Sequence, residues 1–368
     1  MPLGTTTEPT IRLAQKISEI APGDMTRSFF TSGGSEAVET ALKLSRAYFK
    51  RVGEPNRTKF ISRKGSYHGA TMGAMALGGS HLYPKIDYEP FMPGGLHVAQ
   101  PLPYRCEFGG QTPEECADLC ANAVEEMIKF QDPETIAAVI AEPISSPLGC
   151  VVPGDTYWPR LREICDRYGC LLIADEVITG FGRTGRMFGL EHWGIEPDMI
   201  QYAKAITSGY FPLGGTGVND KIAAVLDDGE DVWMHAYTYS AHPVGCAVAM
   251  ANLDIIEGED FPGQAAEKGR YLLEGLNATL GDHPHVGEIR GLGLMVAVEI
   301  VKDRSTKEEF AADEKVGARV NQAMQQHGLF SRMRGDVVCL APPVVVTREE
   351  LDRVIAAMTS AIGDVLGG

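Results

Sequence analysis

The chain has 368 residues, of which 44% are hydrophobic and 22% are charged, and its formal net charge is −16. This balance excludes a disordered chain and argues against nucleic acid or an anionic membrane as a partner. No apolar run reaches membrane-spanning length, and residues 1–10 lack the basic and apolar segments of a signal peptide. We therefore expect a cytoplasmic globular protein that is long enough for two domains.

The first part of the chain alternates between helical and strand-like patterns. Helices are expected at 35–50 and 157–168, and strands at 59–62, 137–141, 171–175 and 199–202. Short apolar strands that alternate with amphipathic helices predict an α/β fold with a largely parallel sheet.

The pattern changes near residue 256. A polar connection at 258–263 precedes a predicted helix at 264–280, a strand-like stretch at 286–300, and helices at 313–327 and 348–365. We interpret 1–256 as a large α/β domain and 257–368 as a smaller C-terminal α+β domain.

Polar side chains follow three of the predicted strands. Glu142 follows the strand 137–141, Asp175 ends the strand 171–175, and Lys204 comes just after 199–202. Ligands of open α/β sheets bind at the carboxyl ends of strands. A strand-ending acid is often only a cap, and most lysines are solvated. Pyridoxal phosphate, however, requires both a lysine as Schiff-base partner and an acid that keeps its ring nitrogen protonated.

Other segments carry weaker signals. Gly34 and Ser35 precede a helix, whose N-terminus suits a phosphate, although an ordinary N-cap formed by Ser35 is the commoner arrangement. The ring of Tyr67 could stack on a cofactor ring. The commoner alternative is that Tyr67, His68 and the following glycine simply pack a loop. Residues 207–215 are predicted as a mobile glycine-rich turn, and the hydroxyls of 237–240 precede a helix that starts near 242.

Three further patterns limit the chemistry. Residues 180–185 are glycine-rich but do not match the dinucleotide fingerprint, so we reject nucleotide binding. Arg332 and Arg334 precede a predicted strand at 337–340 and suit either carboxylate binding or an exposed basic turn. The eight cysteines form no C-x-x-C pair and no metal-ligand spacing with histidines, so we expect buried reduced thiols and no metal.

Taken together, these segments resemble the class III (ω-amino acid) aminotransferases, which are pyridoxal-phosphate enzymes of fold type I. The matching segments are 32–37, 67–69, 142–143, 175–185, 203–204, 235–243 and 290–295. They extend over nearly the whole chain, and the aspartate block followed by the lysine block is the most specific part.

The resemblance implies roles for individual residues. Lys204 would bind the cofactor as a Schiff base and carry protons, and Asp175 would pair with the ring nitrogen. Tyr67 and Val177 would contact opposite ring faces, and the phosphate would lie on the start of the first helix. The expected cofactor-binding set is Gly34, Ser35, Tyr67, His68, Glu142, Asp175, Val177, Lys204 and Thr238.

The resemblance also implies a partner and a substrate. Thr238 would reach the phosphate of a neighbouring subunit, so a homodimer with shared active sites, or a tetramer, is expected. Arg332 occupies the position of the mobile arginine that binds the substrate carboxylate. The substrates would be an amine donor and a 2-oxo acid acceptor.

Four departures from the family pattern affect these expectations. Ile178 stands where many members have glutamine, Ala236 replaces a glycine, and family members carry several dozen residues before the segment matching 3–7. Ornithine- and aminobutyrate-type members pair the mobile arginine with a glutamate, and that position is Pro147 here. We therefore favour an ω-transaminase that uses pyruvate, with β-alanine, taurine or an aryl-alkyl amine as examples of its donor.

Three alternatives stay open. One is a 2-oxoglutarate-dependent aminotransferase of the aminobutyrate or ornithine type. The second is a decarboxylase or an aminomutase on the same fold. The third is a shortened, inactive homologue that only binds the cofactor, because the residues that usually precede 3–7 contribute to the substrate pocket.

Overall fold

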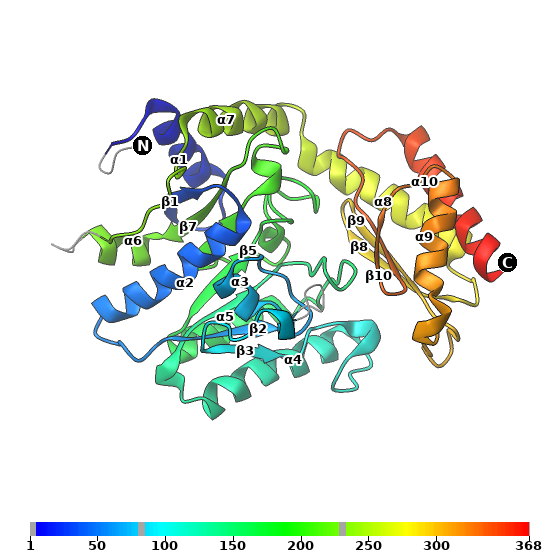
Figure 1. Ribbon diagram of the computed structural model, residues 1–368, viewed down its shortest axis with the longest axis horizontal. Helices are drawn as coiled ribbons and strands as arrows, with labels where there is room; N and C mark the ends of the chain where they lie inside the picture. The colour runs from blue at the N-terminus through cyan, green and yellow to red at the C-terminus, as the bar shows by residue number, and fades with distance from the viewer. Residues whose placement is uncertain (1–4, 80–84, 228–232, 368) are drawn as a thin grey trace. The chain divides into compact units, whose positions relative to one another are not determined.

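The computed structural model describes residues 5–79, 85–227 and 233–367. The chain divides into two compact units (Figure 1). The first unit comprises Met1–Pro143, Pro153–Phe181 and Met187–Glu259, and the second comprises Ile144–Val152, Gly182–Arg186 and Asp260–Gly368. Two short segments from the first part of the chain thus belong to the second unit. The domain boundary at 256/257 stays a prediction.

A seven-stranded sheet forms the centre of the first unit, in the order β1-β7-β6-β5-β4-β2-β3. Its strands are β1 (Met25–Thr31), β2 (Lys59–Arg63), β3 (Gly95–Val98), β4 (Ile136–Ala141), β5 (Leu171–Asp175), β6 (Met199–Tyr202) and β7 (Gly214–Asn219). The five strands from β3 to β6 in this order run parallel, whereas β7 is antiparallel to both of its neighbours. The predicted α/β class with a largely parallel sheet is confirmed.

Helices cover both faces of this sheet. They are α1 (Glu8–Ile20), α2 (Gly34–Arg51), α3 (Met72–Leu77), α4 (Pro113–Phe130), α5 (Tyr157–Tyr168), α6 (Asp220–Asp227) and α7 (Pro243–Gly258), with short 3₁₀ turns between them. Ile140 and Ile173 share a core with Leu42 of α2. Val139 and Leu172, which point to the opposite face, are also buried. Strands buried on both faces are continuously apolar, which is why the sequence predicts β4 and β5 well.

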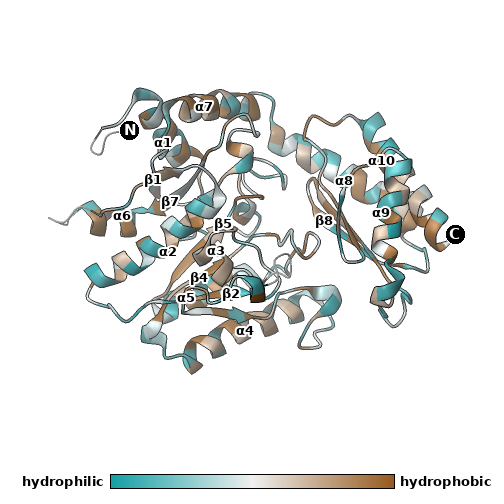
Figure 2. Ribbon diagram, viewed as in Figure 1, coloured by the Kyte–Doolittle hydropathy of each residue, from teal (hydrophilic) through white to brown (hydrophobic). Residues whose placement is uncertain are grey.

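The second unit has its own four-stranded antiparallel sheet, in the order β10-β11-β9-β8. The strands are β8 (Val286–Leu292), β9 (Met295–Ile300), β10 (Arg332–Arg334) and β11 (Val337–Leu340), and the helices are α8 (Phe261–Leu280), α9 (Val316–Gln326) and α10 (Arg348–Leu366). Helices such as α4 and α8 show both hydrophobic and hydrophilic patches in Figure 2, as expected of helices with one buried face. None of the described helices combines the length and hydropathy needed to cross a bilayer.

The glycine-rich turn predicted at 207–215 is partly wrong. Gly214 and Gly215 begin β7, and both are buried in the sheet. A Cβ on Gly215 would lie 2.6 Å from the ring of Tyr202, and a Cβ on Gly214 would lie 2.8 Å from the backbone of Gly33. Glycine is needed here because neighbouring groups approach the strand closely, not because the chain turns.

The predicted start of α8 is also wrong by three residues. The helix begins at Phe261, because Asp260 caps it by accepting the Gly263 N–H at 3.1 Å and Pro262 occupies its first turn. The polar stretch that predicted a connection is therefore the capping sequence of the helix itself.

Substitution of Gly269 tests how closely α8 packs on the turn between β8 and β9. A Cβ on Gly269 would lie 2.0 Å from the carbonyl oxygen of Gly293, whereas a Cβ on Gly363 of α10 meets nothing within 4 Å. Gly269→Ala should lower the free energy of unfolding by about 1–3 kcal/mol despite the better helix propensity of alanine. The control Gly363→Ala should raise it by about 0.5–1 kcal/mol. Denaturant titration of the two variants measures both changes, and a stabilised Gly269→Ala variant would contradict the packing.

Candidate active site

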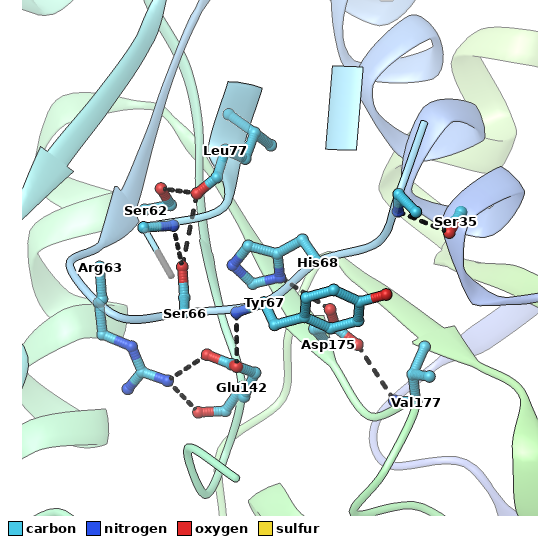
Figure 3. Close-up of polar contacts among 12 residues, drawn as sticks. Ser35, Ser62, Arg63, Ser66, Tyr67, His68, Leu77, Glu142, Asp175 and Val177 are labelled. Atoms are coloured by element: carbon cyan, nitrogen blue, oxygen red, sulfur yellow. Dashed lines mark hydrogen bonds and ion pairs between the residues drawn. The ribbon is translucent and has the colours of Figure 1, made fainter. Parts of the chain in front are cut away.

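Asp175 and His68 form the centre of the candidate site (Figure 3). Asp175 ends β5, and its Oδ2 lies 2.7 Å from Nδ1 of His68 in the loop after β2. Its Oδ1 accepts the Val177 N–H at 3.1 Å. Both side chains are at most 5% exposed. These bonds fix the carboxylate, while Nε2 of His68 is buried and has no hydrogen-bond partner among the described residues.

Gly34 and Ser35 begin α2 beside Val177, two residues after Asp175. A Cβ on Gly34 would lie 2.9 Å from Cγ1 of Val177, so glycine allows the helix to approach the end of β5 closely. The expectation that Ser35 caps α2 is wrong, because its Oγ instead accepts the Ala70 N–H at 3.0 Å. Gly33 is the N-cap residue, and no side chain caps the helix. An uncapped helix N-terminus leaves N–H groups for an anion.

Glu142 holds the loop that carries Tyr67. Its Oε1 accepts the backbone N–H of Tyr67 at 3.1 Å, and its Oε2 lies 3.2 Å from the guanidinium of Arg63. Arg63 is only 2% exposed and lies over the rings of Tyr157 and Trp158. The sequence analysis missed Arg63, although an arginine that ends an apolar strand is a signal for a buried ion pair.

Lys204 lies at the same end of the sheet as Asp175. The parallel strands β5 and β6 place Asp175 opposite Gln201, and Lys204 follows three residues later in the 3₁₀ turn Lys204–Ile206. Its φ of +47° lies in the left-handed region, which is uncommon for lysine and costs strain of about 1 kcal/mol or more. Asn252 holds this turn by donating to the carbonyls of Ala205 and Ile206. The side chain of Lys204 is exposed.

Thr238 and Arg332 lie on other segments. Thr238 is exposed in the loop before α7. In the same loop, His235 lies 2.9 Å from both Oγ1 of Thr40 and Nζ of Lys43. Burial and the Lys43 charge lower the pKa of His235 to about 4, so this histidine is neutral near pH 7. Arg332 begins β10 of the second unit and is exposed.

Glu176 is a third buried acid of this site, and its structural role was not predicted from the sequence. It is 0% exposed and accepts the backbone N–H groups of Gly189 at 2.8 Å and Leu190 at 2.9 Å. Thr179 also donates its hydroxyl to this carboxylate. Burial raises the pKa of Glu176 to about 7. Glu176 therefore anchors the segment 179–190 to the end of β5.

The groups gathered at this end of the sheet fit pyridoxal phosphate. Asp175 offers a fixed carboxylate, Lys204 offers an amine on the neighbouring strand end, and α2 offers an uncapped N-terminus. The buried and unpartnered Nε2 of His68 shows that the site has polar capacity left for a ligand. The sheet topology and these groups together are those of a fold type I pyridoxal-phosphate enzyme.

A model of the family Aminotransferase class-III matches residues 2–362. The chain therefore belongs to the class III aminotransferases. It is 41% identical over 348 residues to a putrescine–pyruvate aminotransferase from Pseudomonas aeruginosa, covering 94% of this chain and 75% of that protein. It is 40% identical over 373 residues to a diaminobutyrate–2-oxoglutarate transaminase from Halomonas elongata, covering 99% and 79% of the two proteins.

A solved structure of an amine transaminase from an uncultivated Pseudomonas species, in its PLP-bound form, matches with a TM-score of 0.95. The sequence identity is 40%, and the match covers 99% of this chain and 83% of that one. The predicted family, the fold type I architecture, the aminotransferase activity and the dependence on pyridoxal phosphate are thus confirmed.

The raised pKa of Glu176 predicts a pH dependence of stability. Between its ordinary value of 4.5 and about 7, the unfolded chain loses the proton of this carboxyl while the folded chain keeps it. Stability should therefore fall as pH rises through this window and stay level above it, by about 3 kcal/mol in total. The difference in unfolding free energy between the wild type and Glu176→Gln should show this fall with pH.

The matched control is Glu274→Gln, which removes an exposed carboxylate in the middle of α8. Its difference from the wild type should stay nearly flat across the same window. A Glu176→Gln difference that is flat or rises with pH would show that the carboxylate is already ionised below pH 7.

Proposed function

We propose that this aminotransferase moves an amino group from an amine or an ω-amino acid to pyruvate. The observation that carries the proposal is that Arg332 forms no ion pair with any described carboxylate. An unpaired guanidinium can bind the α-carboxylate of a 2-oxo acid directly with two parallel hydrogen bonds. The putrescine–pyruvate relative supports the choice of acceptor.

The position of Pro147 supports the same choice. Pro147 lies in the segment Ile144–Val152 of the second unit, which also contains the β10–β11 hairpin. The segment contacts the hairpin, because a Cβ on Gly149 would lie 2.5 Å from Cγ1 of Val337. Proline cannot supply the carboxylate that pairs with the arginine in aminobutyrate-type relatives, so nothing from this position neutralises Arg332.

The chemistry of amino transfer divides between the cofactor and the chain. When bound, pyridoxal phosphate supplies an aldehyde that links to amines and a ring that accepts electrons. In our proposal Lys204 would take the proton from the donor carbon as a general base and, as a general acid, would deliver it to the carbon of the cofactor's aldehyde group. Asp175 holds a proton on the ring nitrogen, and its bonds to His68 and to the Val177 N–H keep it in place.

Binding of the cofactor uses the remaining predicted residues. We expect Tyr67 and Val177 to contact the two ring faces and the first turn of α2, at Gly34 and Ser35, to hold the phosphate. Glu142 keeps the Tyr67 loop in position. We also expect Thr238 of a second copy to reach the phosphate, which makes the active unit a homodimer.

Replacement of Lys204 tests the catalytic assignment. Lys204→Ala should reduce the rate of amino transfer at least roughly 10⁴-fold, because both the covalent attachment and the proton carrier are lost. Lys129→Ala, which removes an exposed lysine of α4, should keep the wild-type rate. Steady-state rates with an aryl-alkyl amine and pyruvate measure both variants. Near-normal turnover of Lys204→Ala would refute the assignment.

Replacement of Arg332 tests the acceptor site. Arg332→Ala should raise the KM for pyruvate by roughly 10-fold or more, because a charge-assisted pair is lost. The KM for an amine donor that has no carboxylate should stay within about twofold. Arg348→Ala, which removes another exposed arginine of the second unit, is the control. An equal rise in both KM values would contradict carboxylate binding by Arg332.

An acceptor panel separates the alternatives. The diaminobutyrate–2-oxoglutarate relative supports 2-oxoglutarate as the second candidate acceptor. Faster turnover with 2-oxoglutarate than with pyruvate would favour it and overturn the pyruvate proposal. Carbon dioxide release would indicate a decarboxylase, an isomerised product without an acceptor would indicate an aminomutase, and an unchanged cofactor absorbance after amine addition would indicate an inactive homologue.

A further inference from the structure

Three cysteine sulfurs lie together in the first unit. The chain segments that carry them contain none of the site residues assigned above. Cys106 follows the 3₁₀ turn Pro103–Arg105, and Cys116 and Cys120 are one helical turn apart in α4. Their Sγ atoms all lie within 4.8 Å of one another. Cys116 and Cys120 are 0% exposed, whereas Cys106 is half-buried and leaves a route from solvent.

This cluster differs from the other neighbouring thiols of the chain. Cys150 lies beside Cys339, and Cys165 lies beside Cys170, so each of these groups offers two sulfurs. Among the residues with described positions, no other three ligand atoms of histidine, cysteine or acidic side chains lie as close as those of the cluster. All eight cysteines are free thiols. Cys116 and Cys120 form an i, i+4 pair on α4, which a pattern of cysteines with histidine partners does not reveal.

The spacing fits the coordination of one thiophilic ion. With a Zn–S distance of about 2.3 Å, sulfurs of a tetrahedral or trigonal site lie about 3.8–4.0 Å apart. The sulfurs here need to move by at most about 1 Å, which rotation about χ1 can supply. A site with three protein sulfurs leaves the fourth position of a tetrahedral ion for water.

The backbone around Cys106 is arranged to stabilise a thiolate. The N–H groups of Phe108 and Gly110 hydrogen bond to its sulfur. Gly110 also brings this loop onto the first turn of α4, since a Cβ there would lie 2.8 Å from the Cys116 nitrogen. Cys116 itself lies near the N-terminus of α4, where the helix dipole favours negative charge.

The third sulfur bonds to the backbone of a residue whose side chain lacks a partner. Cys120 donates to the backbone carbonyl of Gln100 at 3.4 Å. Gln100 is 7% exposed, and neither its amide nitrogen nor its amide oxygen has a hydrogen-bond partner among the described residues. Buried amides are normally paired, so this segment has polar capacity that the protein itself does not use.

Two of the three thiols resist ionisation. Burial raises the pKa of Cys106, and the hydrogen bond that Cys116 donates to Cys120, together with burial, raises the pKa of Cys116. A bound metal ion would supply the positive charge that favours the thiolate forms of its ligands.

We propose that Cys106, Cys116 and Cys120 form a binding site for one thiophilic d¹⁰ cation, with Zn²⁺ as the probe. Binding exchanges the three thiol protons for one ion that is held by three thiolates. The ion would tie the segment after β3 to α4 and would act as a structural clip outside the amino-transfer chemistry.

Metal titration of the reduced, chelator-treated holoenzyme tests this proposal. We expect one Zn²⁺ per chain by elemental analysis, a thiolate-to-cobalt charge-transfer band with Co²⁺, and a higher melting temperature with Zn²⁺. Cys106→Ser and Cys120→Ser should each weaken Zn²⁺ binding by roughly 100-fold or more. Cys246→Ser is the matched control for Cys120→Ser, because Cys246 is as buried as Cys120 but lies beside Thr10 instead of other thiols.

Cys106→Ser distinguishes the loss of a metal ligand from a loss of the fold. Its side chain is half-buried in a loop, so the variant should keep the transaminase rate and the cofactor absorbance of the wild type. Absence of bound Zn²⁺ in the wild type would overturn the proposal. Equal Zn²⁺ affinity of the wild type and Cys106→Ser, or a loss of binding in Cys246→Ser, would also overturn it.

Discussion

The parallel pairing of β5 with β6 is the constraint on which the candidate site depends. It places Asp175 opposite Gln201, so that Lys204 follows at the same end of the sheet. Side chains alternate between the faces of a strand, and a slip of one residue would turn the Asp175 carboxylate to the other face. The apolar side chains buried on both faces of β4 and β5 prevent such a slip, since every one of them would lose its packing.

Buried charge around this pairing is satisfied by fixed hydrogen bonds. Asp175 is held by His68, Glu142 by Arg63, and Glu176 by two backbone N–H groups. An isolated carboxylate in such surroundings would be strongly destabilising, whereas a fully bonded one orients the loops around it. The three acids thus tie the loop after β2 to the ends of β4 and β5, and they tie Thr179, Gly189 and Leu190 to the end of β5.

Amino transfer requires one site to accept two substrates in turn. The proposed donor carries no α-carboxylate, and the proposed acceptor does, so the group that binds the carboxylate must tolerate its absence. Arg332 is the exposed first residue of a three-residue edge strand and forms no ion pair with a described acid. A solvated guanidinium loses little when its ligand leaves, which agrees with alternating binding of substrates with and without an α-carboxylate.

The outcome of the sequence analysis differs between the elements of the chain. The continuous apolar runs predicted β4, β5 and β6 correctly, and the 3.6-residue period predicted α5 at its observed bounds. The glycines of β7 predicted a turn, because a strand that admits neighbours at close range has the composition of a loop. Arg63 looked like an ordinary strand end, and its partner Glu142 lies 79 residues later.

What the sequence by itself determined is local or carried by family motifs: the α/β class, the class III resemblance, the cofactor, an acid at the end of one strand and a lysine just after another. Local periodicity and motif spacing are properties of residues that are close along the chain. Only the tertiary structure decided that Ser35 bonds Ala70, that Arg63 supports Glu142, and that three cysteine sulfurs meet. These contacts join segments whose separation depends on how strands and helices pack, and no pattern within one segment specifies it.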